Sequence, residues 1–156
     1  MALRSLLIGL LAALAATAAL AGPLGRYVNA RFHYSVDYPT DLMRPMPESE
    51  NGDGRAFAVL LPTRADVRVY AGFNAMNRSA EQIVRDFEEE CHGRASYRVA
   101  RPDLAAASCV YGGEIFYQKT LIRGDRLVSL HAQYLISARR RLDPAIALMA
   151  SSLRVR

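Results

Sequence analysis

The chain has 156 residues, of which 51% are hydrophobic and 22% charged, and it carries a formal net charge of +5 at pH 7. This length is sufficient for one domain with a hydrophobic core. The positive charge is too small for the dense basic stripe of a nucleic-acid-binding protein, so we expect no nucleic-acid partner.

Residues 1–21 predict a secretory signal peptide. Arg4 supplies a short positive region, residues 6–20 are uncharged and largely apolar, and Ala19 and Ala21 place small side chains at the two positions that signal peptidase reads. The apolar run is shorter than the roughly 20 residues that span a bilayer as a helix, so we expect no stable membrane span after cleavage. We expect cleavage after Ala21, a single domain over residues 22–156, and a periplasmic or secreted location.

Alternating apolar and polar residues predict the first strands of this domain. One strand is expected from His33 to Tyr38, where Pro39 ends it, and two more are expected around residues 57–61 and 67–73. The segment 42–55 is rich in Pro, Gly and acidic residues, which favours a long connection.

The period changes to that of a helix over residues 79–91, where apolar residues recur every three or four positions. Ser79 and Gln82 match a capping box at the start of this helix, and Gly93 suits its end. Cys91 lies on the apolar stripe, so we expect it to face the sheet.

The second half of the chain predicts more strands and a closing helix. Short strands are expected near residues 97–99 and 107–111, and residues 114–122 and 127–136 form a long hairpin that turns at 123–125. Asp143 and Pro144 are expected at the start of the last helix. Together these elements predict an α+β domain: an antiparallel β-sheet with one inserted helix and one C-terminal helix.

Two cysteines follow the predicted signal peptide, Cys91 and Cys109. In an oxidising compartment, a pair of cysteines indicates one structural disulfide, and two buried free thiols are the alternative. The spacing between them is not that of a redox CxxC motif, so we expect no thiol chemistry.

Few residues suggest catalysis or metal binding. His33, Ser35 and Asp37 have the composition of a hydrolase triad, but alternate residues on a strand stand about 6.5 Å apart. A nucleophile and its base need contact at about 3 Å, so a solvated strand face is the favoured interpretation. His92 and His131 complete three histidines without ligand spacing. We therefore expect no metal and no cofactor.

Two polar surfaces are candidates for binding a partner. The loop 48–54 carries Glu48, Glu50 and Asp53, and it lacks the bidentate Glu that would complete a calcium loop, so we interpret it as a surface turn. His131 and Gln133 share the polar face of the predicted strand 127–136. These five residues form the candidate partner surface.

Arg139-Arg140-Arg141 precedes the predicted last helix and could meet phosphate groups of lipids, although a solvated run of charges is the simpler interpretation. The chain also contains eight tyrosines, whose amphipathic rings suit either the rim of a sheet or a partner interface.

Four segments carry a resemblance to known proteins: Tyr27-Val-Asn-Ala-Arg-Phe32, Tyr34-Ser-Val-Asp-Tyr-Pro39, Glu50-Asn-Gly-Asp-Gly-Arg55 and Gly113-Glu-Ile-Phe-Tyr-Gln-Lys119. With the order of elements, they resemble the PsbP/Mog1-like α/β/α sandwich and a group of small exported bacterial proteins. The resemblance implies non-enzymatic accessory, chaperone or binding modules, and it brings no active site to these residues. Fold alone does not fix function.

These observations together predict an exported, non-enzymatic binding or accessory protein of the bacterial cell envelope. Its partner would be an envelope protein or a small envelope ligand. A periplasmic immunity or inhibitor protein is the alternative, and a hydrolase is a third possibility that would need a pocket joining His131 or His33 to a nucleophile.

Overall fold

The computed structural model describes residues 22–93 and 95–156, and residues 1–21, where the signal peptide is predicted, lie outside this part. Ten strands and two α-helices occur in the described residues, which confirms the predicted α+β class. The strands are β1 (Leu24–Asn29), β2 (Tyr34–Pro39), β3 (Met43–Glu48), β4 (Gly54–Val59), β5 (Ala65–Phe73), β6 (Tyr97–Arg101), β7 (Leu104–Tyr111), β8 (Glu114–Arg123), β9 (Arg126–Leu135) and β10 (Arg154–Val155). The helices are α1 (Ala80–Glu90) and α2 (Arg139–Ser152), and a short 3₁₀ helix (Ile136–Ala138) precedes α2.

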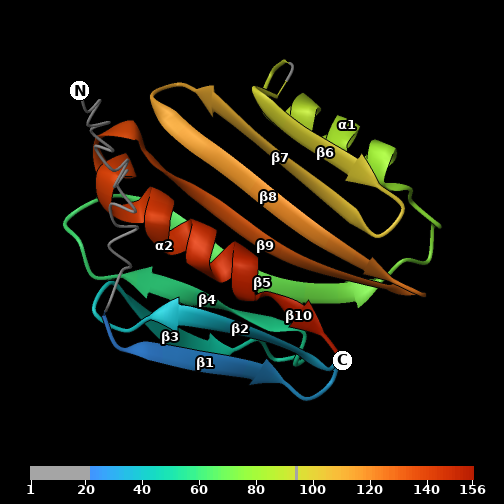
Figure 1. The fold of residues 1–156 in the computed structure, drawn as a ribbon, viewed down its shortest axis with the longest axis horizontal. Helices are drawn as coiled ribbons and strands as arrows, with labels where there is room; N and C mark the ends of the chain where they lie inside the picture. Colours follow the sequence, from blue (N-terminus) through green and yellow to red (C-terminus); the bar gives the residue numbers. More distant parts are fainter. Residues whose placement is uncertain (1–21, 94) are drawn as a thin grey trace, which may run out of the picture.

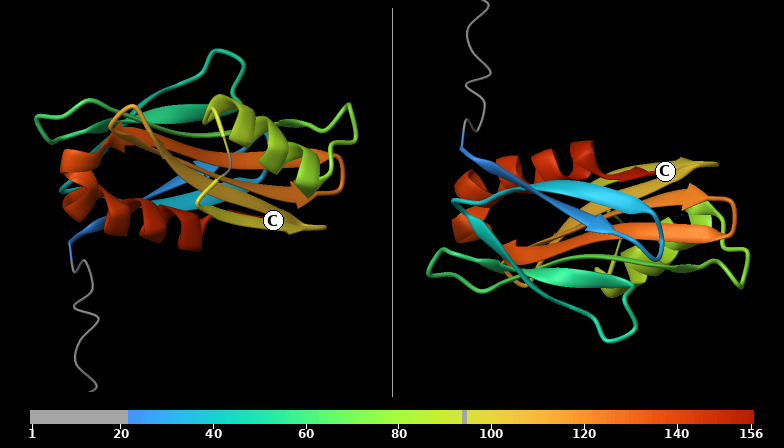
Figure 2. Two further views of the ribbon diagram at one scale, coloured as in Figure 1. Left: turned by 90° about the horizontal axis from the view of Figure 1, so that it is seen from above. Right: turned by 90° about the horizontal axis from the view of Figure 1, so that it is seen from below.

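The strands form two antiparallel sheets. The larger has seven strands in the order β3-β4-β5-β9-β8-β7-β6, and the smaller has the order β1-β2-β10 (Figure 1). Helix α2 and the small sheet lie on one face of the large sheet, whereas α1 lies on the opposite face (Figure 2). The molecule is therefore layered around the large sheet.

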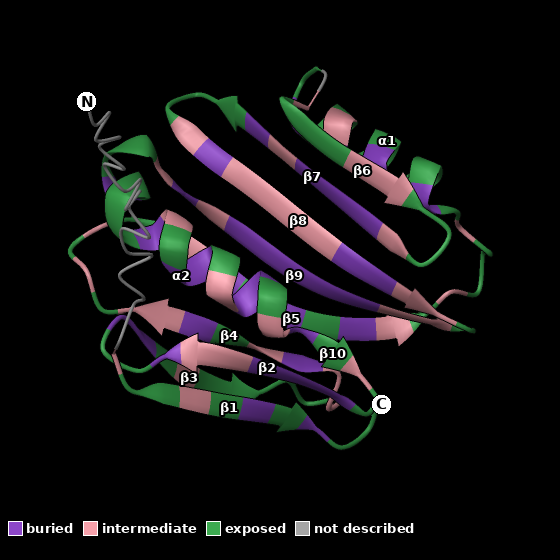
Figure 3. Ribbon diagram, viewed as in Figure 1, coloured by how far each residue is buried: buried purple, intermediate pink, exposed green. Residues whose placement is uncertain are grey.

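Each helix covers only part of its face. On one face, Leu142 and Met149 of α2 pack with Val36 of β2 and Leu130 of β9 in the main core. On the other face, α1 packs on β6 and β7 in a separate, smaller core. Consequently α1 leaves β4, β5 and β9 partly uncovered on its face of the large sheet. On the opposite face, α2 leaves β6, β7 and β8 partly uncovered. Many residues of β8 are only half-buried (Figure 3).

Helix α1 follows the predicted pattern at its start. The Ser79 hydroxyl accepts a hydrogen bond from the backbone N–H of Gln82, and the Gln82 side chain accepts one from the N–H of Ser79, which is the capping box. At its end, the residue with positive φ is His92 (φ 54°) rather than Gly93. The N–H of Gly93 donates to the Glu88 carbonyl, so the helix closes in a Schellman-type turn one residue earlier than expected.

The expectation that residues 42–55 form a long connection is wrong for their first half. Met43–Glu48 forms β3, which pairs with β4. The strand accommodates Pro45 and Pro47 because it lies at the edge of the sheet, where a missing backbone N–H costs little. Only the turn at residues 49–53 remains irregular between the two strands.

The predicted start of the last helix is also wrong. Helix α2 begins at Arg139, so Pro144 lies inside it, and no side chain caps its first turn. Asp143 instead accepts a hydrogen bond from the Tyr134 hydroxyl at 2.7 Å. The carboxylate thus ties α2 to β9 rather than capping the helix.

Candidate functional site: a groove beside helix α1

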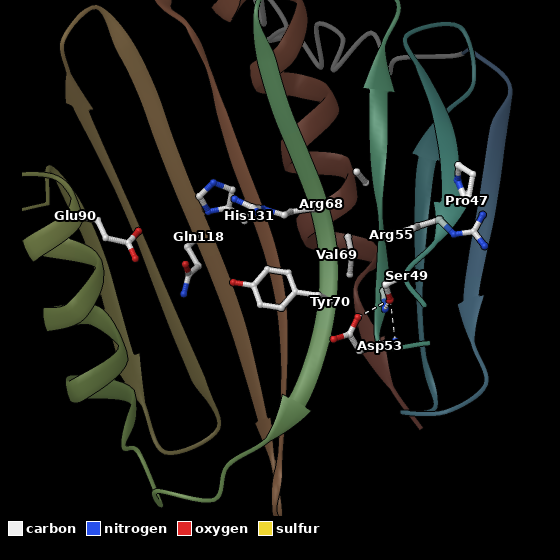
Figure 4. Close-up of a pocket in the computed structure, with 12 residues that line it drawn as sticks. Pro47, Ser49, Asp53, Arg55, Arg68, Val69, Tyr70, Glu90, Gln118 and His131 are labelled. Carbon is white, nitrogen blue, oxygen red and sulfur yellow. Dashed lines mark hydrogen bonds between the residues drawn. The ribbon is translucent and has the colours of Figure 1, made fainter. Parts of the chain in front are cut away.

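The open half of the face that carries α1 contains a groove of about 470 Å³. It lies over β4, β5, β8 and β9, between the end of α1 and the turn that joins β3 to β4 (Figure 4). We call it the α1-side groove. Its lining residues are Pro47, Ser49, Asp53, Gly54, Arg55, Ala56, Arg68, Val69, Tyr70, Glu90, Gln118 and His131.

The floor of the α1-side groove is built from polar side chains in register. Arg68 lies opposite His131, and His131 lies opposite Gln118, so one cross-strand row joins β5, β9 and β8. Directly opposite residues in neighbouring strands point to the same face of a sheet. Val69 of β5 and Leu130 of β9 point the other way, into the main core. Phe116, Ile122 and Leu127 lie on the same face as His131 and pack with the smaller core, so this face is polar at the row and apolar toward α1.

His131 is the most unusual residue of the floor. It is only 8% exposed, and its Nε2 is buried without a hydrogen-bond partner among the described residues. Burial, helped by the positive charge of Arg68, lowers the pKa of His131 below 6.5, so the imidazole is neutral at pH 7. An unpaired buried polar atom typically costs about 1–3 kcal/mol, which a ligand could recover by bonding to it.

Tyr70 and Arg68 border the floor on β5. The Tyr70 ring is 38% exposed and its hydroxyl lies toward Gln118 (Figure 4). Burial raises the pKa of Tyr70, so the hydroxyl is a neutral donor and acceptor at pH 7. Arg68 pairs with Asp66 at 2.9 Å, and both side chains are about half exposed. Such exposed pairs contribute little, so the guanidinium stays available to a ligand.

The wall formed by the β3–β4 turn is held by its own side chains. The Ser49 hydroxyl donates to Asp53 Oδ1 at 2.6 Å and accepts from the backbone N–H of Asp53. The Asn51 amide donates to Asp53 Oδ2 at 2.8 Å. The Asp53 carboxylate therefore organises the turn, as in the surface turn that the sequence favours over a calcium loop.

A buried network anchors this wall to the small sheet. The Asn29 amide donates to Glu48 Oε1 and to the Gly52 carbonyl, each at 2.9 Å, and its own oxygen accepts from the backbone N–H of Phe32. The Tyr27 hydroxyl also donates to Glu48. Glu48 is itself exposed, but its Oε1 accepts from Tyr27 and Asn29, and the residue does not line the groove.

The structure separates the five residues of the predicted partner surface. Asp53 and His131 both line the α1-side groove. Glu50 is exposed on the turn, and Gln133 donates to Glu114 at 3.0 Å, and neither belongs to the lining. His131 lies on a polar row of its strand, as the sequence predicts. Arg68 and Tyr70 were missed because only the pairing of β5 with β9 brings them there, and Glu90 because only the packing of α1 does. Gln118 was missed although the predicted hairpin places it opposite His131.

The groove does not have the contacts of a hydrolase site. Ser49 is bonded to Asp53 rather than to His131, and His131 Nε2 has no hydrogen-bond partner within residues 22–93 and 95–156. His33 lies in the β1–β2 turn with φ 54°, Ser35 is buried, and Asp37 pairs with Arg26 at 2.6 Å. The expectation that these three residues form one solvated strand face is therefore wrong for Ser35, which is buried.

Within residues 22–93 and 95–156, no three His, Cys, Asp or Glu side chains gather in a way that could hold a metal ion. No helix in that same part of the chain combines the length and apolar character needed to cross a bilayer.

No model of a known protein family matches the chain, and no curated protein matches it. Solved structures do match. The solution structure of cyanobacterial PsbP (CyanoP) from Synechocystis sp. PCC 6803 superposes with a TM-score of 0.59 over 85% of this chain and 92% of that chain, at 12% sequence identity. The fold is PsbP-like. This confirms the resemblance predicted from the order of elements.

A second match is the crystal structure of LpqN, involved in cell envelope biogenesis of Mycobacterium tuberculosis, with a TM-score of 0.46, 14% identity and 86% of each chain covered. At these identities the likeness concerns the PsbP-like fold and not the residues of the groove. What the α1-side groove does must therefore be inferred from its own side chains.

Proposed function

We propose that this chain is an exported accessory protein of the cell envelope that acts by binding, and that the α1-side groove is its binding site. The observation that carries the proposal is the groove itself, an uncovered region with a polar floor beside α1. Binding sites are typically concave and offer a few convergent polar groups, as this groove does.

The cysteines support export. Cys91 and Cys109 are joined by a disulfide with Cα atoms 6.3 Å apart, which agrees with the pairing expected from the sequence. Disulfides persist in oxidising compartments such as the periplasm or the extracellular space. The predicted signal peptide at residues 1–21 supports the same location.

The polar groups of the groove favour a polar ligand or a polar segment of a partner protein. Arg68 and Gln118 offer hydrogen-bond donors on the floor, whereas Glu90 at the end of α1 faces them from the rim (Figure 4). A ligand with acceptors for the floor and a donor for Glu90 would satisfy both. Because no nucleophile is bonded to His131, we propose binding rather than catalysis.

Affinity retention from an envelope extract tests the proposal. The mature, oxidised protein is immobilised, and the species that it retains are compared with those retained by Arg68→Ala and Gln118→Ala variants. We expect a specific species with the wild type and a clear loss with either variant. The matched control is Arg140→Ala, which removes an exposed arginine of α2 that does not line the groove.

Two outcomes would contradict the proposal: no species specifically retained by the wild type, or equal retention by the groove variants. The identity of a retained species also separates the alternatives. A secreted toxin would favour an immunity or inhibitor protein, and an envelope protein or small molecule would favour an accessory protein.

A further inference from the structure

The face that carries α2 also has an open half, where two adjoining cavities line the strands that α2 leaves uncovered. The first has about 380 Å³ and includes Tyr97, Val110, Tyr117 and Ile146. The second has about 360 Å³ and includes Arg101, Lys119, Arg123 and Arg154. This region, which we call the α2-side trough, is distinct from the α1-side groove because it lies on the opposite face of the large sheet.

The two cavities follow one another along the same elements. Tyr117 and Lys119 lie two residues apart on one face of β8, about 6.5 Å at the usual rise of a strand. Ala147 and Ser151 lie four residues apart on α2, about one helical turn. The first cavity therefore forms an aromatic end of the trough, and the second cavity forms a cationic end next to it.

The cationic end has an excess of positive charge. Its lining contains four cations and a single carboxylate, that of Asp103, which lies 3.6 Å from Arg123. Leu104, Leu121 and Leu153 also belong to the lining. Four cations against one carboxylate give this end a positive field, which favours an anion there.

Backbone carbonyls accept hydrogen bonds from three of these cations. Lys119 Nζ donates to the Ala150 carbonyl at the end of α2 at 2.6 Å, and Arg154 donates to the Ser151 carbonyl at 3.1 Å. Arg123 donates to the carbonyl of Asp103 at 2.9 Å. Burial and the three neighbouring arginines lower the pKa of Lys119, a sign of the crowding of positive charge. Lys119 and Arg154 thus have carbonyl partners and no ion pair with a carboxylate of the described residues, whereas Arg123 also pairs with Asp103.

The aromatic end exposes apolar surface next to this charge. Tyr97 is 51% exposed and Val110 is 58% exposed, on neighbouring strands β6 and β7. Apolar side chains that gather around a cavity in a soluble domain indicate a surface that is covered by something.

We propose that the α2-side trough binds a single-chain anionic amphiphile, whose phosphate-type headgroup lies among Arg101, Lys119, Arg123 and Arg154 and whose hydrocarbon chain lies over Tyr97, Val110 and Tyr117. Charge complementarity selects the headgroup, and the adjoining apolar end selects the chain. The occupant is a monomeric amphiphile rather than the surface of a membrane, since the excess of positive charge lies at one end, whereas Arg139 at the aromatic end pairs with Asp143 at 3.5 Å.

Calorimetry of the mature, oxidised protein with dodecyl phosphate below its critical micelle concentration tests the proposal. We expect binding that weakens about tenfold or more in the double variant Arg101→Gln, Arg123→Gln, because hydrogen bonds to charged groups are worth that much. The matched control, Arg140→Gln with Arg141→Gln, removes the same charge from exposed residues of α2 outside the trough. It should bind as the wild type does.

A second double variant, Tyr97→Ser with Val110→Ser, tests the aromatic end with exposed side chains whose loss leaves the core intact. It should weaken dodecyl phosphate and leave any binding of inorganic phosphate unchanged. Thermal melts followed by circular dichroism confirm that each variant folds, and binding is measured only with folded variants.

Five results would overturn the proposal. One is no binding of dodecyl phosphate, and another is equal binding by the Arg101, Arg123 variant. A third is equally tight binding of neutral dodecyl maltoside, which would leave the cations without a role. A fourth is inorganic phosphate binding as tightly as dodecyl phosphate, which would indicate a simple anion site. The fifth is binding only to vesicles of phosphatidylglycerol, which would indicate a membrane surface.

Discussion

Asn29 shows how one buried side chain determines the shape of the α1-side groove. It is fully buried, and its amide bonds to β3, to the β3–β4 turn and to the β1–β2 turn. The wall that contains Ser49 and Asp53 thus depends on a residue that does not line the groove. Sequence patterns gave no indication of this role, because β1 was not predicted and a polar residue such as Asn29 is usually exposed to solvent.

We expect Asn29→Ala to lower the free energy of unfolding by about 2–4 kcal/mol, since it leaves the buried N–H of Phe32 and the Glu48 carboxylate with fewer partners. Urea denaturation of the two proteins measures the difference. The control is Asn51→Ala, which removes an exposed asparagine of the β3–β4 turn and should change the free energy of unfolding by less than about 1 kcal/mol. Equal effects of the two substitutions would contradict the structural role of Asn29.

Gly54 is required by the close approach of two strands beside the groove. A Cβ at this position would lie 2.1 Å from the Val69 carbonyl oxygen and 2.6 Å from Tyr70 Cα, both backbone atoms of β5. We expect Gly54→Ala to destabilise the fold by about 1–3 kcal/mol or more, because backbone must move. Gly72→Ala, where a Cβ would meet no atom within 4 Å, should be neutral or slightly stabilising. Thermal unfolding measures the melting temperatures of both variants. Similar melting temperatures would show that β4 and β5 can move apart at Gly54 without loss of stability.

His131 predicts a specific dependence of stability on pH. Its folded pKa is lowered below 6.5 by burial, so below pH 6.5 the unfolded chain takes up a proton before the folded protein does. The stability of the wild type should therefore fall between pH 6.5 and the lower, folded pKa. His131→Gln cannot titrate and should lose this contribution to the slope. Urea denaturation at about pH 7 and about pH 5 compares the two proteins. Identical slopes would mean that His131 is solvated.

The disulfide joins α1 to the sheet at the edge of the molecule. Cys91 follows α1, Cys109 lies on β7, and both belong to the smaller core. We expect the double variant Cys91→Ala, Cys109→Ala to lose about 3 kcal/mol of stability, from the closure of a loop with a sequence separation of 18 residues. Denaturation with and without reductant measures the effect. A wild type that is insensitive to reductant, and as stable as the variant, would argue against the bond.

Elements with a strong period could be predicted from the sequence, and those without one could not. The stripe of α1 and the alternation of β2, β5, β8 and β9 gave the right kind of element in each place. β3 was missed because its two prolines resemble a loop, and β10 because two residues carry no pattern. The start of α2 was misplaced because Asp143 and Pro144 match a helix start, although Asp143 is bonded to Tyr134 instead.

The arrangement of the whole molecule follows from two helices that cover opposite faces of one sheet at different places. Helix α1 packs toward the β6 edge, and α2 packs over β9 beside the small sheet (Figures 1 and 2). Two half-faces therefore stay open, one with the α1-side groove and one with the α2-side trough.

The sequence predicted the α+β class and the polar face of His131, but it could not predict which other residues stand beside them. The neighbours of His131 are Arg68, which is more than 60 positions earlier, and Gln118 from the preceding strand. The proximity of Arg68 depends on β5 pairing with β9, which no local pattern in the sequence indicates. The proximity of Gln118 follows from the predicted hairpin of β8 and β9. Of the predicted partner surface, Asp53 and His131 line the groove, and its binding role stays a prediction.

Site-specific photo-crosslinking in cells tests most directly whether this protein acts by binding through the α1-side groove. A photoreactive amino acid replaces Ala56, an exposed residue of the groove, or Arg140, an exposed residue of α2 outside it. We predict a discrete adduct from position 56, absent from position 140 and lost when Arg68→Ala is added. No adduct from position 56, or the same adduct from both positions, would contradict a binding role for the groove.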